Sequence, residues 1–194
     1  MRRLKVLEVE QPGPFRLGGP VPRLPLSFNG ERYKFFGCFP WLPDGALGLS
    51  LFVSTDDDEL FDSERKIEDS TGPVKILLHD LDVPSASPQS SFFRRVYGLE
   101  VGEEEPDEGE FEGEVFRPAV GNKLLGAPAI IHPSSRDLVE PLFSEGYHLY
   151  LQLDNPMFGD PHLGEIWPFQ DGLFFLFFRL DAQSVSWKWL WEHG

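Results

Sequence analysis

The stretch QDGLFFLFFRLDA, residues 170–182, decides the fold class. Six consecutive apolar residues, Leu173 to Phe178, follow an Asp-Gly pair, and Leu180 lies beyond Arg179. A helix that is apolar on every side is usually longer than this run, whereas Phe favours strands and Asp-Gly marks a turn. The run is also much shorter than the roughly 20 apolar residues that cross a bilayer. We therefore predict a β-strand that is buried on both faces.

Strand patterns recur along the rest of the chain. They are found at residues 4–9, 32–39, 46–53, 73–80, 91–98, 147–154 and 186–193. In the last of these, Trp187, Trp189 and Trp191 fall on one face and Lys188 and Leu190 on the other, as a strand with one buried face requires.

Helix signals are few. Residues 134–146 form the best candidate, with Ser134 or Ser135 as the N-cap, Pro141 limiting the length and Gly146 ending the helix. A second short helical turn is predicted within residues 56–66. We therefore expect an α+β, β-dominated fold of largely antiparallel sheets with few short helices, in which the 18 Pro and 19 Gly serve the turns.

An acidic stretch interrupts this pattern. Residues 100–114, EVGEEEPDEGEFEGE, contain nine acidic residues and no basic one. Like charges at this density resist packing into a core, so we predict a solvated loop, either ordered or disordered. We expect one domain, residues 1–194, in which this loop separates two halves at about residues 1–99 and 115–194. Two roles remain open for this loop: a solubilising insertion, or a docking surface for a basic partner.

The two halves resemble each other. LGGPVP at residues 17–22 corresponds to LGAPAI at 125–130, and PDGALGLSLFV at 43–53 corresponds to QDGLFFLFFRL at 170–180, in the same order. Such self-similarity suggests a duplicated β unit in which each copy has an apolar face to cover.

Charge limits the possible partners. The chain has 32 Asp plus Glu against 17 Lys plus Arg, a formal net charge of -15, and only Met1 to Lys5 is locally basic. This field disfavours nucleic acid and anionic lipid and favours a basic protein. The start of the chain lacks the pattern of a signal peptide, so we expect a cytoplasmic protein, either monomer or homodimer. The single Cys38, among aromatic residues, is predicted to be a core residue rather than a nucleophile.

The candidate binding residues are Gln152, Asp154, Trp167 and Asp171, with Asp160 and His162 in the loop between the strand of Gln152 and the strand that Asp171 opens. Gln152 and Asp154 alternate with leucines and so project from one face of a strand. Such a set can bind a metal or supply a general base, yet Asp before Asn-Pro or Gly commonly starts a turn. We predict no catalytic residue, cofactor or metal set, because no motif for one is present.

A family resemblance rests on the order of several motifs: LGGPVPRLP (17–25), FPWLPDGALGLSLFV (39–53), NKLLGAPAIIH (122–132), YLQLDN (150–155) and IWPFQDGLFFLFFRLDAQSVSWKWLWEH (166–193). In this order the chain resembles the YwqG-like family, a bacterial domain of unknown function. The resemblance implies a β-rich α+β fold and a cytoplasmic bacterial protein. The chain departs from the family at Phe28-Asn29 and at Phe169 to Asp171, where members carry tryptophan motifs, and it lacks the helical N-terminal extension.

Three functions are consistent with these observations. The first is an acidic protein-interaction module, an immunity-type protein that neutralises a basic toxin being one form, since the resembled family is associated with such gene neighbourhoods. The second is a small-molecule or metal-binding protein, or an enzyme, that uses the cleft around Gln152, Asp154 and Asp171. The third is a structural domain without a ligand. We favour the first, which is not an enzyme.

Overall fold

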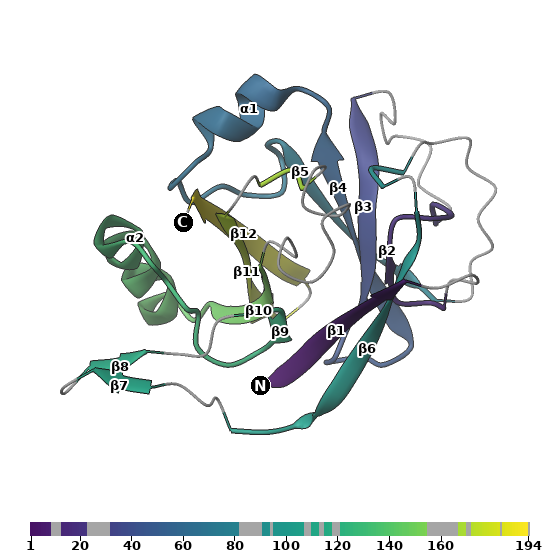
Figure 1. Cartoon of the computed structure of the whole chain (residues 1–194). Coiled ribbons are helices and arrows are strands. Elements are labelled where there is room, and N and C mark those ends of the chain that lie inside the picture. The colour runs from purple at the N-terminus through teal and green to yellow at the C-terminus, as the bar shows by residue number, and fades with distance from the viewer. Residues whose placement is uncertain are drawn as a thin grey trace. The chain divides into compact units, whose positions relative to one another are not determined.

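The computed structural model describes residues 1–8, 13–22, 32–81, 91–93, 95–106, 110–112, 115–117, 121–154, 167–169, 172–182 and 184–193. In these residues the fold is β-dominated, with twelve strands and two short helices (Figure 1). The chain forms two compact units. Unit 1 contains Met1–Leu4, Asp62–Asp69 and Val101–Gly194, and unit 2 contains Lys5–Phe61 and Ser70–Glu100. The predicted fold class is confirmed.

Each unit is built on five strands of an antiparallel sheet. Two strands, β1 (Arg2–Glu8) and β6 (Tyr97–Glu104), contribute residues to both units. Unit 2 has the order β6-β2-β3-β4-β5, with β2 (Arg16–Leu17), β3 (Tyr33–Pro40), β4 (Leu47–Ser54) and β5 (Val74–Asp80). Unit 1 has the order β1-β9-β10-β11-β12, with β9 (Lys123–Leu124), β10 (His148–Leu153), β11 (Gly172–Asp181) and β12 (Ser184–His193). The helices are α1 (Asp57–Asp62) and α2 (Pro133–Ser144), and β7 (Glu110–Glu112) pairs with β8 (Val115–Arg117) in a separate hairpin.

The two units repeat one backbone design. The two-residue strands β2 and β9 are each followed by two residues at positive φ: Gly18 (69°) and Gly19 (75°) in unit 2, and Leu125 (62°) and Gly126 (88°) in unit 1. The first residue of each pair donates its N–H to a carbonyl at an irregularity in the next long strand, at Phe36 in β3 and at Tyr150 in β10. A three-stranded meander follows in both, so the topology agrees with the predicted duplication.

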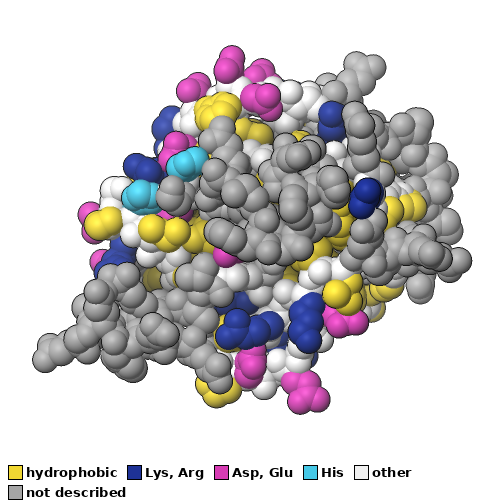
Figure 2. All heavy atoms as spheres, viewed as in Figure 1, with side chains coloured by type: hydrophobic (Ala, Val, Ile, Leu, Met, Phe, Trp, Pro, Cys, Tyr) yellow, Lys and Arg dark blue, Asp and Glu magenta, His cyan; other side chains and the backbone are white. Residues whose placement is uncertain are grey.

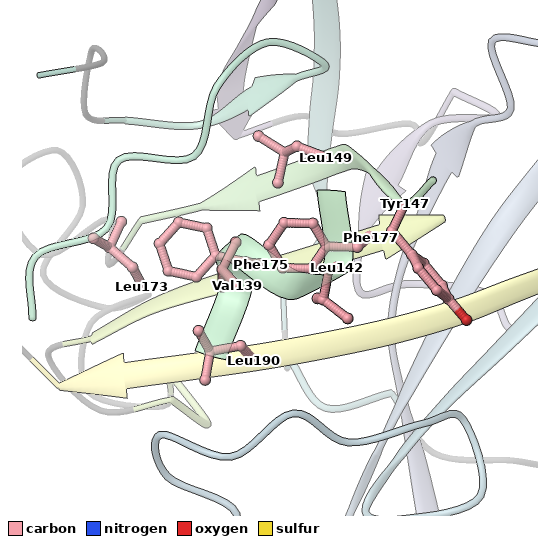
Figure 3. Close-up of a cluster of buried hydrophobic side chains, with 8 residues drawn as sticks. All are labelled: Val139, Leu142, Tyr147, Leu149, Leu173, Phe175, Phe177 and Leu190. Atoms are coloured by element: carbon pink, nitrogen blue, oxygen red, sulfur yellow. The ribbon is translucent and has the colours of Figure 1, made fainter. Parts of the chain in front are cut away.

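Strand β11 is buried on both faces, as predicted. On one face, Leu173, Phe175 and Phe177 pack with Val139 and Leu142 of α2 (Figure 3). Side chains on the opposite face contact aromatic neighbours: Phe174 stacks with Phe169 and Trp189, and Phe178 packs edge-on against Tyr150. Burying one such Phe is worth about 2–3 kcal/mol, so this strand supplies much of the core of unit 1.

The tryptophan-rich strand β12 differs from the expectation of one buried face. Trp189 and Trp191 share a face, as predicted, but Leu190 and Glu192 on the other face are also fully buried. The reason is that α2 and the segment before it cover the side of Leu190 and Glu192. Alternation along β12 correctly assigns residues to faces, but it cannot reveal that a helix elsewhere in the chain covers the second face.

Two further expectations at the middle of the chain require correction. Residues 91–98 were expected to form one strand, but β6 begins at Tyr97 and Ser91 makes only an isolated bridge with Phe35. Phe93 is buried by contact with Phe36, at a ring-centre distance of 5.2 Å, and not by strand pairing. The apolar residues of this segment therefore indicate that it is buried, but they do not indicate a strand.

The acidic stretch 100–114 is also partly regular and not simply a loop. Strand β6 extends to Glu104, and residues 110–112 form β7. The basic start of the chain compensates part of the charge, because Arg3 Nε lies 3.0 Å from Glu105 Oε1 and the Met1 ammonium donates to the Glu105 carbonyl at 2.9 Å. Opposite charges on neighbouring segments thus allow pairing that the local composition disfavours.

Helix α2 occupies the predicted position with different ends. Its N-cap is His132, which makes no side-chain capping bond, so neither Ser134 nor Ser135 is the cap. Pro141 lies inside the helix, which continues to Ser144, and Gly146 at φ 83° follows its end. The short helix predicted within 56–66 is α1.

Candidate functional site

Gln152, the first predicted binding residue, holds a backbone segment in unit 1. Its Oε1 accepts the N–H of Ala129 at 2.9 Å, and its Nε2 donates to the carbonyl of Gly121 at 3.0 Å. The side chain is fully buried on β10. Both the oxygen and the nitrogen of the Gln152 amide therefore hold the backbone of residues 121–129 in place. In the described structure, this side chain has a structural role.

The other predicted residues are placed less completely. Asp154 follows β10 directly, is half-buried, and donates its backbone N–H to Asn122 Oδ1 at 2.8 Å. Trp167 is buried and packs edge-on against Phe169, with ring centres 6.2 Å apart. Asp171, Asp160 and His162 lie outside the described residues. The use of Asp154 with Asp171 as a cleft therefore stays a prediction.

Two buried charged residues of unit 1 were missed by the sequence reasoning. Lys123 on β9 is buried directly across from Gln152. Glu192 on β12 is fully buried, and its carboxylate accepts the N–H groups of Ile131 at 2.7 Å and His132 at 3.3 Å. These amides belong to the segment that enters α2, so Glu192 anchors the start of the helix that covers the core. The sequence signal for Glu192 was its place among the tryptophans, on the face opposite to them.

Unit 2 contains a polar row that crosses adjacent strands on one face of the sheet. Arg16 pairs with Cys38, Cys38 with Ser50, and His79 lies beside them on β5, opposite Gly48. His79 Nε2 is 2.7 Å from Ser50 Oγ and 3.8 Å from Cys38 Sγ. The prediction that Cys38 is a core residue is confirmed by its burial, but its neighbours are polar as well as aromatic.

The electrostatics of this row favour neutral Cys38. Burial raises the pKa of the Cys38 thiol, and this outweighs the opposing effects of the Ser50 hydrogen bond and of the Arg16 charge. Burial also lowers the pKa of Arg16, whose guanidinium lies over the Phe35 ring at 5.5 Å. The row therefore brings a buried thiol and a buried hydroxyl next to a half-buried guanidinium and a half-buried imidazole.

The solvent face of α2 carries a group of carboxylates. Asp137, Glu140 and Glu145 are exposed and, with Pro141 and Ser144, they line a shallow hollow of about 540 Å³. No carboxylate of the three forms an ion pair with another described residue. Figure 2 shows acidic, hydrophobic and basic side chains next to one another in the region of this helix.

Metal and membrane signals are absent from the described part of the chain. Within the described ranges, no three His, Cys, Asp or Glu side chains gather as a metal-binding group. None of the described helices is long and apolar enough to span a bilayer.

Comparisons with known proteins identify no relative: no family model matches the chain, and neither a curated protein nor a solved structure is significantly similar to it. The function has to be argued from the geometry.

Proposed function

We propose that this protein is an acidic interaction module that binds a basic protein partner through the solvent face of α2. The observation that carries this proposal is the set of three exposed carboxylates, Asp137, Glu140 and Glu145, around one hollow on that helix. Among the described residues none of the three has a cationic partner. A lysine or arginine side chain of a partner would supply the missing charge.

The position of these carboxylates on the helix strengthens the argument. A helix C-terminus carries a partial negative charge and is stabilised by nearby cations. α2 has no basic residue in its last turn, and Glu145 is its C-cap. Arg179 donates to the backbone carbonyl of Glu145 at 3.4 Å, but its ion pair is with Asp181. Arg179 therefore supplies one cation to the last carbonyls of α2, while the exposed side chains of Asp137, Glu140 and Glu145 have no ion-pair partner among the described residues.

Apolar side chains beside the carboxylates provide contact area. Leu138 is 39% exposed and Phe143 is 44% exposed, on the two flanks of the acidic face. Interfaces commonly place a few apolar or aromatic anchors inside a polar rim. The formal net charge of -15 would then accelerate the encounter with a basic protein and make it sensitive to salt.

The experiment compares two variants with the same change in charge. The triple variant Asp137→Asn, Glu140→Gln, Glu145→Gln removes the acidic face of α2. A control variant, Asp58→Asn, Asp62→Asn, Asp80→Asn, removes three exposed carboxylates outside α2 and outside residues 100–114. Each immobilised protein is incubated with an extract of the source cells, and the retained proteins are identified. The affinity of each variant for the purified partner is then measured.

We expect wild type and control to retain the same basic protein, and the α2 variant to bind it about 10- to 100-fold more weakly, from about 0.5–1 kcal/mol for each exposed charge. Binding should weaken as salt rises. Equal loss in both variants would show that only total charge matters, and retention of no basic protein by wild type would refute the proposal.

A narrower form of the proposal rests on the resemblance to YwqG-like proteins, which itself remains a proposal. In that form the basic partner is a toxin, and the chain is its antidote. Expression of a toxic basic product of a neighbouring reading frame should then stop cell growth. Coexpression of the wild-type chain should restore growth, whereas coexpression of the α2 variant should not.

A further inference from the structure

Pro141 leaves one backbone acceptor of α2 without its helical donor. In an α-helix each N–H donates to the carbonyl one turn earlier, and proline has no N–H. Because Pro141 lies inside α2, the carbonyl of Asp137 receives no bond from that position. The helix continues regularly after the proline, since Glu145 donates its backbone N–H to the Pro141 carbonyl at 3.0 Å. The missing bond therefore concerns the Asp137 carbonyl.

This carbonyl belongs to the hollow that the carboxylates surround. Helix carbonyls point toward the C-terminus, so the Asp137 oxygen is directed toward the turn that contains Pro141. Both residues are exposed and line the hollow of about 540 Å³. The ring of a proline inside a helix also pushes the carbonyl of the preceding turn outward. The hollow therefore offers a backbone oxygen beside the carboxylate side chains.

Most polar groups of the hollow are hydrogen-bond acceptors. Asp137 and Glu140 lie on the same side of successive turns, a spacing that places Cβ atoms about 5–6 Å apart. Carboxylate and carbonyl oxygens accept hydrogen bonds and donate none, and Ser144 supplies the one hydroxyl among the lining residues. A cation that fits this set must therefore provide several N–H donors in different directions.

We infer that the hollow binds an arginine side chain of the partner in preference to a lysine side chain, an inference that rests on the proposed function and narrows it. A guanidinium is a planar fork of N–H donors, so it can bond to a carboxylate and to the neighbouring carbonyl together. An ammonium group is a strongly hydrated point charge without this shape. The Pro141 ring provides an apolar surface for the weakly hydrated guanidinium plane. Glu145, at the C-cap, stays available to other cations of the partner.

The test compares two synthetic peptides of equal length and charge, one alternating arginine with glycine and the other alternating lysine with glycine. Their affinities are measured by calorimetry with the full-length wild-type chain and with Pro141→Ala. This variant keeps every charge, but its new N–H can bond to the Asp137 carbonyl and its side chain lacks the ring. Pro43→Ala, at an exposed proline in the turn before β4, is the matched control.

We expect wild type and Pro43→Ala to bind the arginine peptide about 5-fold or more tightly than the lysine peptide, as one added hydrogen bond from a charged group would give at an exposed site. In Pro141→Ala the preference should fall below about 2-fold, because the Asp137 carbonyl is then occupied by the helix. Carbon NMR of the wild-type chain needs no variant: the Asp137 carbonyl resonance should shift with the arginine peptide, and much less with the lysine peptide.

Two results would overturn the inference. One is an arginine preference in Pro141→Ala equal to that of wild type, and the other is an Asp137 carbonyl resonance that neither peptide moves. Neither result bears on whether the carboxylates of α2 retain a basic protein from the extract, which is measured with the natural partner. Failure of this inference is therefore distinguishable from failure of the proposed function.

Discussion

Replacing Glu192 with alanine tests how unit 1 holds its covering helix. The fully buried carboxylate accepts the N–H of Ile131 at 2.7 Å and that of His132 at 3.3 Å. Hydrogen bonds to a charged group contribute about 1.5–3 kcal/mol each, and the longer one should lie at the low end. We therefore expect Glu192→Ala to lower the free energy of unfolding by about 3–4.5 kcal/mol. Glu192→Gln, which keeps one acceptor, should cost roughly half as much.

Urea unfolding followed by circular dichroism measures this effect. With a slope of ~2 kcal/mol per molar, the urea midpoint of Glu192→Ala should fall by about 1.5–2.2 M while the slope is unchanged. Amide exchange at Ile131 and His132 should accelerate more than exchange in β11. Glu104→Gln, whose side chain is 78% exposed, is the control and should change stability by less than about 0.5 kcal/mol. A loss in Glu192→Ala as small as that of the control would refute the anchoring role.

Two further predictions concern stability. Phe175→Ala, at a fully buried position under α2, should cost about 3–5 kcal/mol in urea unfolding, whereas Leu180→Ala, 56% exposed on the same strand, should cost less than about 1 kcal/mol; equal losses would contradict the two-sided burial of β11. Because burial raises the pKa of the Cys38 thiol above its ordinary value, the native thiol holds its proton more tightly than the unfolded one. Its contribution is therefore present below the pKa of the unfolded thiol and is lost as pH rises through the higher folded pKa, so Cys38→Ala should flatten the fall in unfolding free energy above about pH 9; an unchanged slope would contradict this.

The sequence predicted what depends on local pattern. The uninterrupted apolar run before Arg179 identified β11 as buried on both faces, and the Asp-Gly turns located β4 and β11 in corresponding places. The LGGPVP and LGAPAI segments contain the paired positive-φ turns, but the structure pairs Gly18 with Leu125, one residue away from the match of Gly18 with Gly126 that the sequence suggests. These features follow from periodicity and turn chemistry, which neighbouring residues determine.

Features that depend on distant residues escaped prediction. Arg3 and Glu105 lie on segments about a hundred positions apart, so the sequence could not show that their ion pair helps order an acidic strand. The proximity of Cys38 and His79 likewise depends on the register of three strands. Gln152 was recognised as unusual within an apolar strand, but the backbone groups that it binds are determined by the fold alone.

The central claim, that the acidic face of α2 binds a basic protein, is tested most directly by carbodiimide crosslinking of the retained complex. This reagent joins a carboxylate to a lysine amine only when the two are in contact. The account predicts amide links from Asp137, Glu140 or Glu145 to lysines of the partner, in complexes that dissociate at high salt. Links confined to carboxylates outside α2 would contradict it.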